Sequence, residues 1–338
     1  MKNISEVINQ LGFEFASRHN VKGRISVADL FTKSKKRCGI YLLEFANGTY
    51  YVGQALDVVR RFNQHRKNHD HICGLWFQAV RNVDLNEVEQ WIIQKAEKSN
   101  MPLTNRTFVQ NVSGETDLDL VITKEVQEKW LSSKSPSRER SSLMYRTVDE
   151  KFIFKYRDNF QKLVKDEQYP IVKMILKTYI TTCIPFWPKT ELSFWSLSCL
   201  PATNKSTWPR YFCLNINAME ILVLGFEKRT GKPFLFVNLS DYFKRVSKKD
   251  VSSLKSKYNC SEFKPASYRA AAGSSYTVHF RNAEDFIRML KNEPVMVRSM
   301  KELNLRLMRK GGTIYSPYHC FDLVNEVMKK PYVVGGIV

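Results

Sequence analysis

The sequence has no apolar run near the ~18 residues that a membrane-spanning helix needs. Its longest such run, Ile221–Phe226, has the length of a strand. The first residues, Met1–Glu6, lack the apolar block that is typical of a signal peptide. These absences predict a soluble protein of the cytoplasm with no membrane partner.

Paired cysteine motifs are missing too. The seven cysteines are scattered, odd in number and never spaced as Cys-x-x-Cys. This pattern argues against a disulfide framework or a zinc ribbon and favours reduced, mostly buried thiols. The 14 glycines and 12 prolines are ordinary counts, which exclude collagen-like and low-complexity sequence.

Acidic residues are scarce relative to basic ones. The chain has 53 Lys and Arg against 33 Asp and Glu, a net charge of +20. Residues 1–125 hold 17 basic and 14 acidic residues, whereas residues 126–338 hold 36 and 19. The excess of +17 in the second part predicts an anionic partner, and we favour nucleic acid over a membrane surface or generic surface charge.

The length of 338 residues suggests two domains at roughly 150 residues each, and 43% hydrophobic residues are enough to bury a large core. Composition predicts an N-terminal helical extension over 1–36 and a small domain over 37–112. A polar linker follows over 113–145, with 132–142 its most breaker-rich part. Residues 146–338 then form a basic α+β domain that binds DNA or a protein partner.

Local patterns place the elements of the first part. We expect short helices over Ser5–Leu11 and Ser26–Phe31, and a tight hairpin turn at Asn47-Gly48. The predicted strands are Cys38–Phe45, Thr49–Gly53 and Leu75–Val80, and the predicted helices are Asp57–Lys67 and Asn86–Lys98.

The second part predicts a mixed α+β domain without repeats. Residues 152–179 are mainly helical in pattern, and helices follow over 283–291, capped by Asn282, and over 300–310. The expected strands are Leu192–Leu200, Tyr211–Leu224, Pro233–Leu239 and Tyr276–Phe280. No helix-turn-helix, zinc-finger spacing or heptad is recognisable there.

Residues 38–106 carry the chemistry. The hairpin places Tyr41 and Tyr51 on neighbouring strands, while Arg61 and His65 are four apart and share one helix face. The later helix carries Glu89. Phosphodiester hydrolysis needs groups of these kinds: a base for water, a cation for the phosphoryl oxygens and a carboxylate for a divalent metal.

The ordered set resembles the motif of GIY-YIG nucleases. It runs through Gly39-Ile40-Tyr41, Tyr51-Val52-Gly53, Arg61, His65, Glu89 and Asn105. The resemblance covers about 70 residues. It implies a small antiparallel sheet with flanking helices and an endonuclease that cleaves DNA with Mg²⁺, for which Mn²⁺ can substitute.

The resemblance also implies a role for each residue. Tyr41 would be the general base or a water-positioning phenol assisted by His65, and Tyr51 would line the site. Arg61 would stabilise the pentacovalent phosphoryl centre through its forked guanidinium. Glu89 would hold the metal, a hard cation that prefers oxygen ligands.

Two assignments stay open at this point. Glu87 competes with Glu89 as metal ligand, although it faces roughly 200° away around the helix. Arg60 competes with Arg61, but only Arg61 lies one turn before His65. Asn105 is expected to support the site geometry, with a turn residue as the alternative, and Gly53 to let the backbone pass close to the catalytic helix.

Other residues carry weaker hypotheses. A basic set is predicted to contact DNA phosphates, with a solvated edge as the alternative: Lys35, Lys36, Arg37 and Arg60. The spacing of His65, His69, His71 and Cys73 could suit zinc, although a loop is favoured there. Trp187, Trp195 and Trp208 are core residues in one interpretation and base-stacking residues in the other.

The leading hypothesis is a metal-dependent DNA endonuclease of restriction, anti-phage defence or repair. A partner-activated effector, whose C-terminal domain binds protein, is one alternative. A non-catalytic nucleic-acid-binding protein is another, and RNA remains open as the substrate. Because one such site cuts one strand at a time, a homodimer or sequential nicking would be needed to break both strands.

Overall fold

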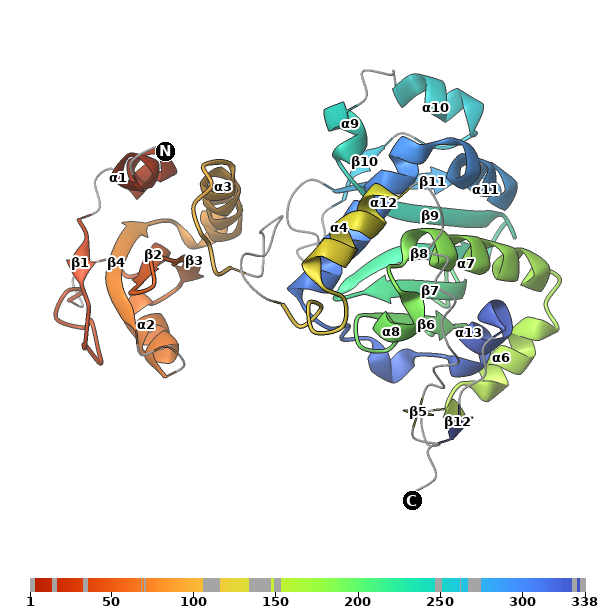
Figure 1. The fold of residues 1–338 in the computed structure, drawn as a ribbon, viewed down its shortest axis with the longest axis horizontal. Coiled ribbons are helices and arrows are strands. Elements are labelled where there is room, and N and C mark those ends of the chain that lie inside the picture. Colours follow the sequence, from red (N-terminus) through yellow and green to blue (C-terminus); the bar gives the residue numbers. More distant parts are fainter. Residues whose placement is uncertain are drawn as a thin grey trace. The chain divides into compact units, whose positions relative to one another are not determined.

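A computed structural model gives two compact units, Met1–Glu115 and Thr116–Val338 (Figure 1). It describes residues 4–13, 17–32, 36–67, 69, 71–105, 116–133, 147–148, 153–246, 251–261, 263–266, 275–329 and 333–334. Each unit is treated separately below. Within the described residues, none of the helices has both the length and the apolar character needed to cross a bilayer.

The first unit is built on a four-stranded antiparallel sheet with the order β1-β4-β2-β3. Its strands are β1 (His19–Asn20), β2 (Gly39–Phe45), β3 (Tyr50–Ala55) and β4 (Ile72–Ala79). The predicted hairpin turn joins β2 to β3, and Gly48 there has a φ of 77°, which a glycine adopts without strain. β3 is an edge strand of the sheet, and the candidate site lies along it.

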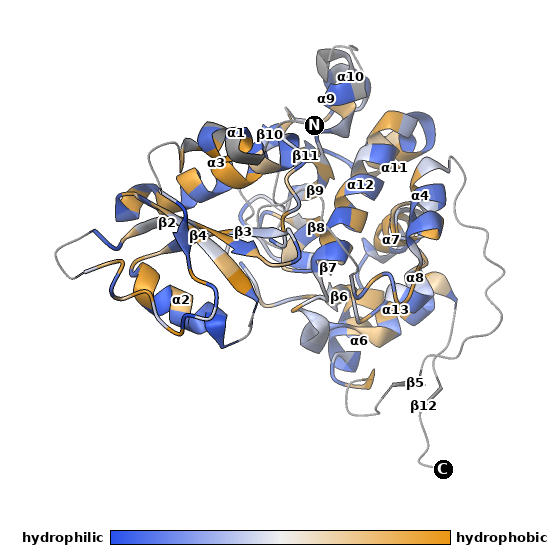
Figure 2. Cartoon of the chain, turned by 60° about the vertical axis from the view of Figure 1, so that its left-hand side comes forward, coloured by the Kyte–Doolittle hydropathy of each residue, from blue (hydrophilic) through white to orange (hydrophobic). Residues whose placement is uncertain are grey.

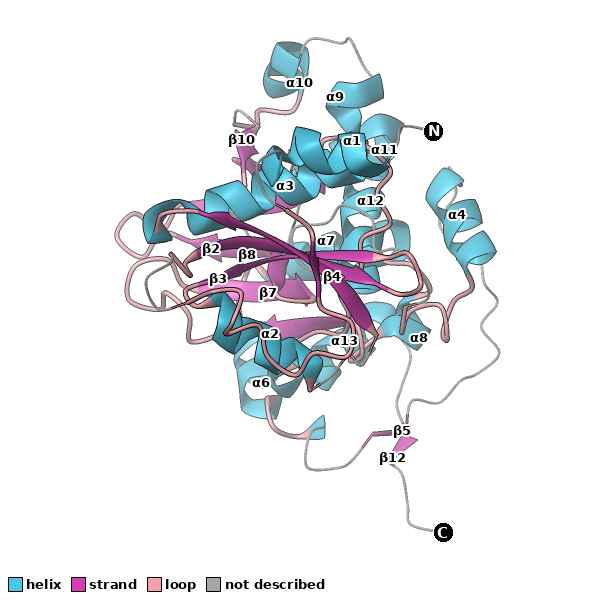
Figure 3. Ribbon diagram, turned by 90° about the vertical axis from the view of Figure 1, so that its left-hand side faces the viewer, coloured by secondary structure: helices cyan, strands magenta, loops and turns pink. Residues whose placement is uncertain are grey.

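Two longer helices cover opposite faces of this sheet (Figure 3). They are α2 (Val58–Arg66) and α3 (Leu85–Lys98), and both alternate apolar and polar residues along their length (Figure 2). Three shorter helical turns complete the unit: α1 (Ile4–Ile8), a π-helical turn η1 (Asn9–Phe13) and a 3-10 turn η2 (Asn82–Asp84). The α+β class and the strand–helix order predicted for this region are confirmed.

The N-terminal segment is helical over 4–13, where a helix is predicted at Ser5–Leu11, but its second part differs from the predicted helical extension. Residues 26–31 form turns, not a helix, and β1 pairs with β4 in the sheet. Val21, Val27 and Phe31 are buried in the same core as the strands of the motif. Residues 26–31 therefore bury their apolar side chains against the sheet as a series of turns. A helix this short is not stable by itself.

The second unit contains a six-stranded antiparallel sheet with the order β10-β11-β9-β8-β7-β6. Its strands are β6 (Trp195–Cys199), β7 (Arg210–Ile216), β8 (Met219–Phe226), β9 (Pro233–Ser240), β10 (Lys264–Pro265) and β11 (Ser275–Phe280). A separate parallel pair joins β5 (Thr147–Val148) to β12 (Val333–Val334).

Helices pack against this sheet, and the longest is α12 (Pro294–Lys310). The others are α4 (Lys124–Ser132), α6 (Arg157–Val164), α7 (Tyr169–Cys183), α8 (Trp187–Thr190), α9 (Tyr242–Val246), α10 (Val251–Lys257), α11 (Ala283–Asn292), η4 (Ser316–Tyr318) and α13 (Phe321–Met328). Asn282 caps α11 as predicted, since its side chain accepts from the Asp285 N–H at 2.8 Å.

The predicted polar linker over 113–145 differs from the structure in its described part. Leu118, Ile122 and Trp130 are buried in the core of the second unit, and the units divide between Glu115 and Thr116. Three apolar residues spaced among polar ones are too sparse a pattern to indicate this packing. The remaining parts, 113–115 and 134–145, lie outside the described residues.

Candidate active site

The start of α2 fixes the position of its catalytic candidates. The Asp57 carboxylate caps the helix by accepting from the N–H groups of Val59 (2.9 Å) and Arg60 (3.1 Å). The apolar stripe of α2 (Val58, Val59 and Phe62) is buried against the sheet. Because this stripe faces the sheet, Arg61 and His65 lie together on another face of α2, next to β2 and β3.

Three predicted residues contact one another directly. The Tyr41 hydroxyl lies 2.7 Å from His65 Nε2, and Arg61 Nε donates to the same hydroxyl at 3.2 Å. The Tyr51 ring lies next to His65 and Tyr41. Its centroid is 4.9 Å from that of the His65 ring and 6.2 Å from that of the Tyr41 ring. The structure thus brings together, from two strands and a helix, the four residues nearest the expected chemistry.

Gly53 makes this cluster possible, for a reason other than the one predicted. It lies opposite Tyr41 in the register of β2 and β3. A Cβ at this position would lie 2.3 Å from the Tyr41 hydroxyl oxygen and 2.8 Å from a ring carbon of Tyr51. Glycine here leaves room for the phenol, whereas the sequence pattern predicts a close passage of the catalytic helix.

Burial sets the protonation states within the cluster. Burial, helped by the Arg61 cation and His69, lowers the pKa of His65 from 6.5 to about 4. Burial, with Tyr51 next in weight, raises the pKa of Tyr41 well above its ordinary value, although contact with Arg61 opposes that rise. At neutral pH the phenol is therefore protonated and the imidazole is uncharged.

These protonation states define the direction of the hydrogen bonds. Since the Arg61 guanidinium can only donate, the Tyr41 oxygen accepts from it. The phenol proton is then available to donate to His65 Nε2 in the tautomer that carries its proton on Nδ1. Arg61 and His65 together polarise the Tyr41 hydroxyl. Its oxygen can therefore accept a proton while the phenol proton passes to His65.

Glu89 comes from α3 and is buried, although most carboxylates are exposed. Its Oε2 accepts from Gln54 Nε2 at 2.9 Å, and Gln54 also donates to Asn86 Oδ1 at 2.7 Å. The Glu89 charge contributes to the raised pKa of both Tyr41 and Tyr51, which places it near the phenols. Glu87, the competing residue, is exposed.

No sequence signal indicates the role of Gln54. It is one polar residue in a strand, and only the pairing of β3 against α3 aims it at Glu89. Gln64 is missed by sequence reasoning as well, and its side-chain oxygen accepts from Arg61 Nη1 at 3.0 Å. Gln54 acts through a tertiary contact that no local sequence pattern carries, whereas Gln64 lies three residues after Arg61 on α2, a helical spacing from which its contact could have been predicted.

The donor set around Glu89 fits a magnesium ion held by few protein ligands. A single buried carboxylate is a hard oxygen ligand, and Mg²⁺ commonly keeps several waters beside one or two carboxylates. No group of three or more His, Cys, Asp or Glu residues is clustered for metal binding in the described part of the chain. The zinc arrangement considered for His65, His69, His71 and Cys73 is therefore absent from these described residues.

Asn105 acts on the backbone of β3. Its side chain donates to the Val52 carbonyl at 2.6 Å and accepts from the Val52 N–H at 2.9 Å. Tyr50, two residues earlier, pairs with the same segment through Pro102 and Thr104. Residues 102–105 thereby extend the sheet beyond its edge strand, and Asn105 holds the strand that carries Tyr51 and Gly53.

The predicted phosphate-contacting residues divide into three groups. Lys35 lies outside the described residues, whereas Lys36 and Arg60 are exposed. Arg37 is committed to the fold, because its guanidinium donates to the Phe31 carbonyl at 2.5 Å and pairs with Asp57 at 3.4 Å. It ties the N-terminal segment to the capping residue of α2.

The three tryptophans considered as base-stacking residues, Trp187, Trp195 and Trp208, have different surroundings. Trp195 is fully buried and donates to the Trp187 carbonyl at 3.2 Å, and Trp187 is also in the core. Trp208 is 44% exposed and packs its ring edge against Phe234. The core interpretation therefore describes Trp187 and Trp195, and only Trp208 is open to a partner.

Residues 37–98 match the family model of the GIY-YIG catalytic domain. The chain therefore carries an N-terminal GIY-YIG domain, which supports a nuclease-type function in general. The resemblance derived from the ordered motif is confirmed over this range. Searches of curated proteins and of solved structures gave no match to the chain.

Proposed function

We propose that this protein is a metal-dependent DNA endonuclease in which the GIY-YIG unit hydrolyses the phosphodiester bond and the basic unit binds DNA. The observation that carries the proposal is the contact set of Tyr41, His65 and Arg61. A scaffold does not need a buried phenol held between a neutral imidazole and a guanidinium, because a phenol hydroxyl is costly to bury.

The residues account for the proton and charge movements of hydrolysis. The Tyr41 oxygen takes a proton from the attacking water as its own proton passes to His65 Nε2. The water oxygen forms the new bond to phosphorus while the bond to the leaving oxygen breaks. Arg61, exposed on its outer side, neutralises charge on the phosphoryl oxygens. Tyr51 lines the site beside them.

Glu89 would hold the divalent cation, Mg²⁺ or Mn²⁺ in its place. When bound, the ion would supply positive charge for the phosphate oxygens and the leaving group. Gln54 fixes the orientation of the carboxylate by donating to Oε2.

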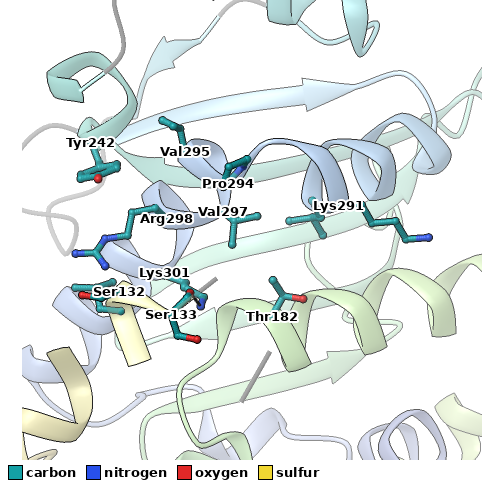
Figure 4. Close-up of a pocket in the computed structure, with 12 residues that line it drawn as sticks. Ser132, Ser133, Thr182, Tyr242, Lys291, Pro294, Val295, Val297, Arg298 and Lys301 are labelled. Atoms are coloured by element: carbon teal, nitrogen blue, oxygen red, sulfur yellow. Dashed lines mark hydrogen bonds between the residues drawn. The ribbon is translucent and has the colours of Figure 1, made fainter. Parts of the chain in front are cut away.

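The second unit is suited to holding the polyanion. Residues 116–338 contain 37 basic and 22 acidic residues, a net charge of +15, against +5 for residues 1–115. One pocket of about 490 Å³ gathers Lys291, Arg298 and Lys301, and none of the described residues that line it is acidic (Figure 4). Lys301 is itself buried, and its Nζ donates to the carbonyls of Trp130 and Ser133 at 3.4 and 3.1 Å. Lys291 and Arg298 are therefore the cations that this pocket offers to a phosphate.

Cleavage of supercoiled plasmid tests the proposal. Wild-type protein with Mg²⁺ or Mn²⁺ is expected to nick or linearise the DNA, and EDTA is expected to stop it. Arg61→Ala is expected to lose at least about 100-fold in rate, in the range that removal of one transition-state donor costs. Arg60→Ala, one residue away and exposed, is the matched control: as a predicted phosphate contact it is expected to weaken binding, but to keep the rate at saturating DNA within about twofold of wild type.

A silent wild-type protein would favour the partner-activated effector, in which the second unit binds protein before cleavage begins. Stable association with a protein after a high-salt wash would support that alternative over direct DNA binding. If the plasmid is only nicked at first and linearised later, one site acts on one strand at a time. The proposal places this chemistry in the cytoplasm, in restriction, anti-phage defence or repair.

A further inference from the structure

The sheet of the second unit carries a polar cavity that the nuclease chemistry does not use. It has a volume of about 630 Å³, within the ~300–1,000 Å³ of small-molecule sites. Neighbouring strands supply its floor, through Ser198 of β6, Asn215 of β7 and Glu220 of β8, with Arg210 beside them. Polar side chains thus take positions on a central sheet where apolar residues are the rule.

This floor is costly to bury, and the hydrogen-bonding capacity of Asn215 is only partly used. Arg210 is 8% exposed and pairs with Glu220 through both of its terminal nitrogens. Asn215 is 5% exposed, and its amide makes two long contacts, each 3.4 Å, with Cys213. An amide can donate two hydrogen bonds and accept two more, so most of this capacity is open to a ligand. A buried ion pair adds little stability by itself, so the floor calls for another explanation.

Aromatic rings form the walls. Tyr156 comes from the start of α6, and Tyr315 and Tyr318 come from the segment around η4. The Tyr156 hydroxyl and Lys155 Nζ both donate to the Pro317 carbonyl, at 3.2 and 2.9 Å, which fixes the wall from α6 against that segment. Tyr318 is 55% exposed, so its ring is offered to an incoming planar group at the mouth.

One cation, Lys205, lines the cavity, and the loop between β6 and β7 that carries it also exposes an aromatic ring, Trp208. The next loop lies beside it, since the Lys228 N–H donates to the Thr207 carbonyl at 2.9 Å. That loop exposes three more basic residues, Lys228, Arg229 and Lys232.

We propose that this cavity holds a nucleobase turned out of a DNA strand. The Arg210–Glu220 pair and the Asn215 amide offer donors and acceptors side by side, which is what the Watson–Crick edge of a base requires. The tyrosine walls match its flat faces, and base–aromatic stacking is a general means of holding a displaced base.

The strand, and not a free nucleotide, is the favoured source of the base. Four basic residues along two adjoining loops are more than one phosphate group needs, and Trp208 offers a second stacking surface outside the cavity. The inference rests on the proposed function, because it makes DNA with a displaced base the preferred substrate. Such a base costs least to turn out where it is unpaired or damaged.

Binding to two duplexes tests the inference. One carries a single unpaired base, the other an abasic residue at the same place, and EDTA prevents cleavage. Wild-type protein is expected to bind the first at least about tenfold more tightly. Tyr318→Ala, at an exposed position, removes the ring and is expected to bring the ratio of the two dissociation constants within about twofold of one. Tyr318→Phe keeps the ring and is expected to keep the wild-type ratio.

Further variants separate the base from the phosphates. Arg298→Gln, in the other pocket, is expected to weaken both duplexes equally and leave the ratio unchanged. Asn215→Ala, with folding checked by circular dichroism, is expected to lower the ratio as Tyr318→Ala does. A wild-type ratio of one, or a ratio that survives both cavity variants, overturns the inference, as does binding of free deoxynucleoside monophosphates as tightly as the unpaired base.

The plasmid assay keeps the two proposals distinguishable. If the protein cleaves plasmid with metal but binds the two duplexes equally tightly, the proposal of a base-binding cavity is wrong and the nuclease proposal stands. A base-dependent ratio without cleavage at any metal concentration supports the cavity, and it replaces the free-standing nuclease with the partner-activated effector.

Discussion

At the scale of single residues, Glu89 and Glu87 form a natural matched pair. They lie two positions apart on α3, but only Glu89 is buried and contacts Gln54. Glu89→Gln keeps the size of the side chain and removes its charge, so we expect plasmid cleavage to fall by at least about 100-fold without loss of folding. Glu87→Gln is expected to stay within about twofold of wild type, since its side chain is solvated.

The check on this pair is the cleavage rate measured as Mg²⁺ is titrated. If Glu89→Gln cleaves at the wild-type rate and needs no more Mg²⁺ than wild type to reach it, this result would falsify the metal role of Glu89. Loss of cleavage in Glu87→Gln instead would move the metal ligand by two residues.

The pKa of His65 predicts an unusual pH profile. Because burial and Arg61 lower it to about 4, the ring stays neutral, and able to accept a proton, down to that pH. We expect kcat/KM, which reports the free enzyme, to fall by less than about twofold between pH 7 and pH 5. A histidine with its ordinary pKa near 6.5 would be mostly charged at pH 5, and the rate would drop about thirtyfold.

The same shift has a consequence for stability. Between about pH 4 and pH 6.5 the unfolded chain binds more protons at His65 than the folded chain does, so stability falls as the pH is lowered through this window.

The measurement that tests the lowered pKa of His65 is the acid limb of the cleavage profile. A limb with an apparent pKa near 6.5 that vanishes in His65→Gln would show that His65 titrates normally and is not the buried acceptor.

At the scale of elements, Gly53 and Gly48 belong to the same hairpin but are under different constraints. A methyl group at Gly53 would overlap the Tyr41 phenol, whereas one at Gly48 meets nothing within 4 Å. Gly53→Ala is therefore expected to displace Tyr41, to cost about 1–3 kcal/mol of stability and to lower cleavage by about 100-fold or more.

Gly48→Ala is the control for this hairpin. It meets only the backbone strain of a positive φ, about 1 kcal/mol, and is expected to retain the cleavage rate of the folded protein. Thermal unfolding and plasmid nicking measured on both variants decide the matter. Equal losses of activity would mean that hairpin stability, and not room for the phenol, explains Gly53.

The edge of the sheet yields another prediction. Asn105→Ala removes both hydrogen bonds to the buried Val52 backbone, so we expect β3 to lose about 2–4 kcal/mol of protection. Hydrogen exchange of peptides that cover Tyr50–Ala55 measures this loss directly. Thr104→Val is the matched control, because it keeps the 2.7 Å backbone bond to Tyr50 and removes only a hydroxyl hydrogen bond. Unchanged exchange in the alanine variant would contradict the clamp.

The same elements show what the sequence could predict. Apolar periodicity locates α2 and α3, because each buries one face against the sheet and the period reveals that face. β2 is located as a continuous apolar run, and β3 as the return strand after the predicted turn. The helical period also places Arg61 with His65. The contacts that give Gly53 and Asn105 their roles depend on strand register and on a segment fifty residues away, and no local pattern records those. The cation of Arg37 is visible in the sequence and predicts a contact with DNA, but its acceptors, Phe31 and Asp57, are tertiary.

The second unit is harder to predict for a related reason. Apolar runs predict β6, β9 and β11, but the run predicted as one strand over Tyr211–Leu224 is two antiparallel strands, β7 and β8. The polar face formed by Ser198, Asn215 and Glu220 is scattered across three strands. Each residue taken singly is an ordinary polar position. They form a cavity floor only because β6, β7 and β8 are neighbours in the sheet.

At the scale of the whole molecule, charge is divided between a first unit with a net charge of +5 and a strongly basic second unit with +15. If the second unit supplies affinity, removal of its cations weakens binding and flattens its dependence on salt without slowing the chemical step. We choose Lys291→Gln with Arg298→Gln, two cations of one pocket whose described lining contains no acid. Removing one cation–phosphate interaction reduces the slope of log K against log salt by about 0.9, so the expected change for the pair is about two.

The control pair is Lys22→Gln with Lys98→Gln, two exposed cations of the first unit. Removing them changes the total charge by the same amount, so a slope set by net charge alone would fall equally in both double variants. A slope that falls only for the second-unit pair, with wild-type cleavage at saturating DNA, assigns affinity to that unit. A slope unchanged by Lys291→Gln with Arg298→Gln would mean that the basic excess serves another anion and that the catalytic unit grips DNA by itself.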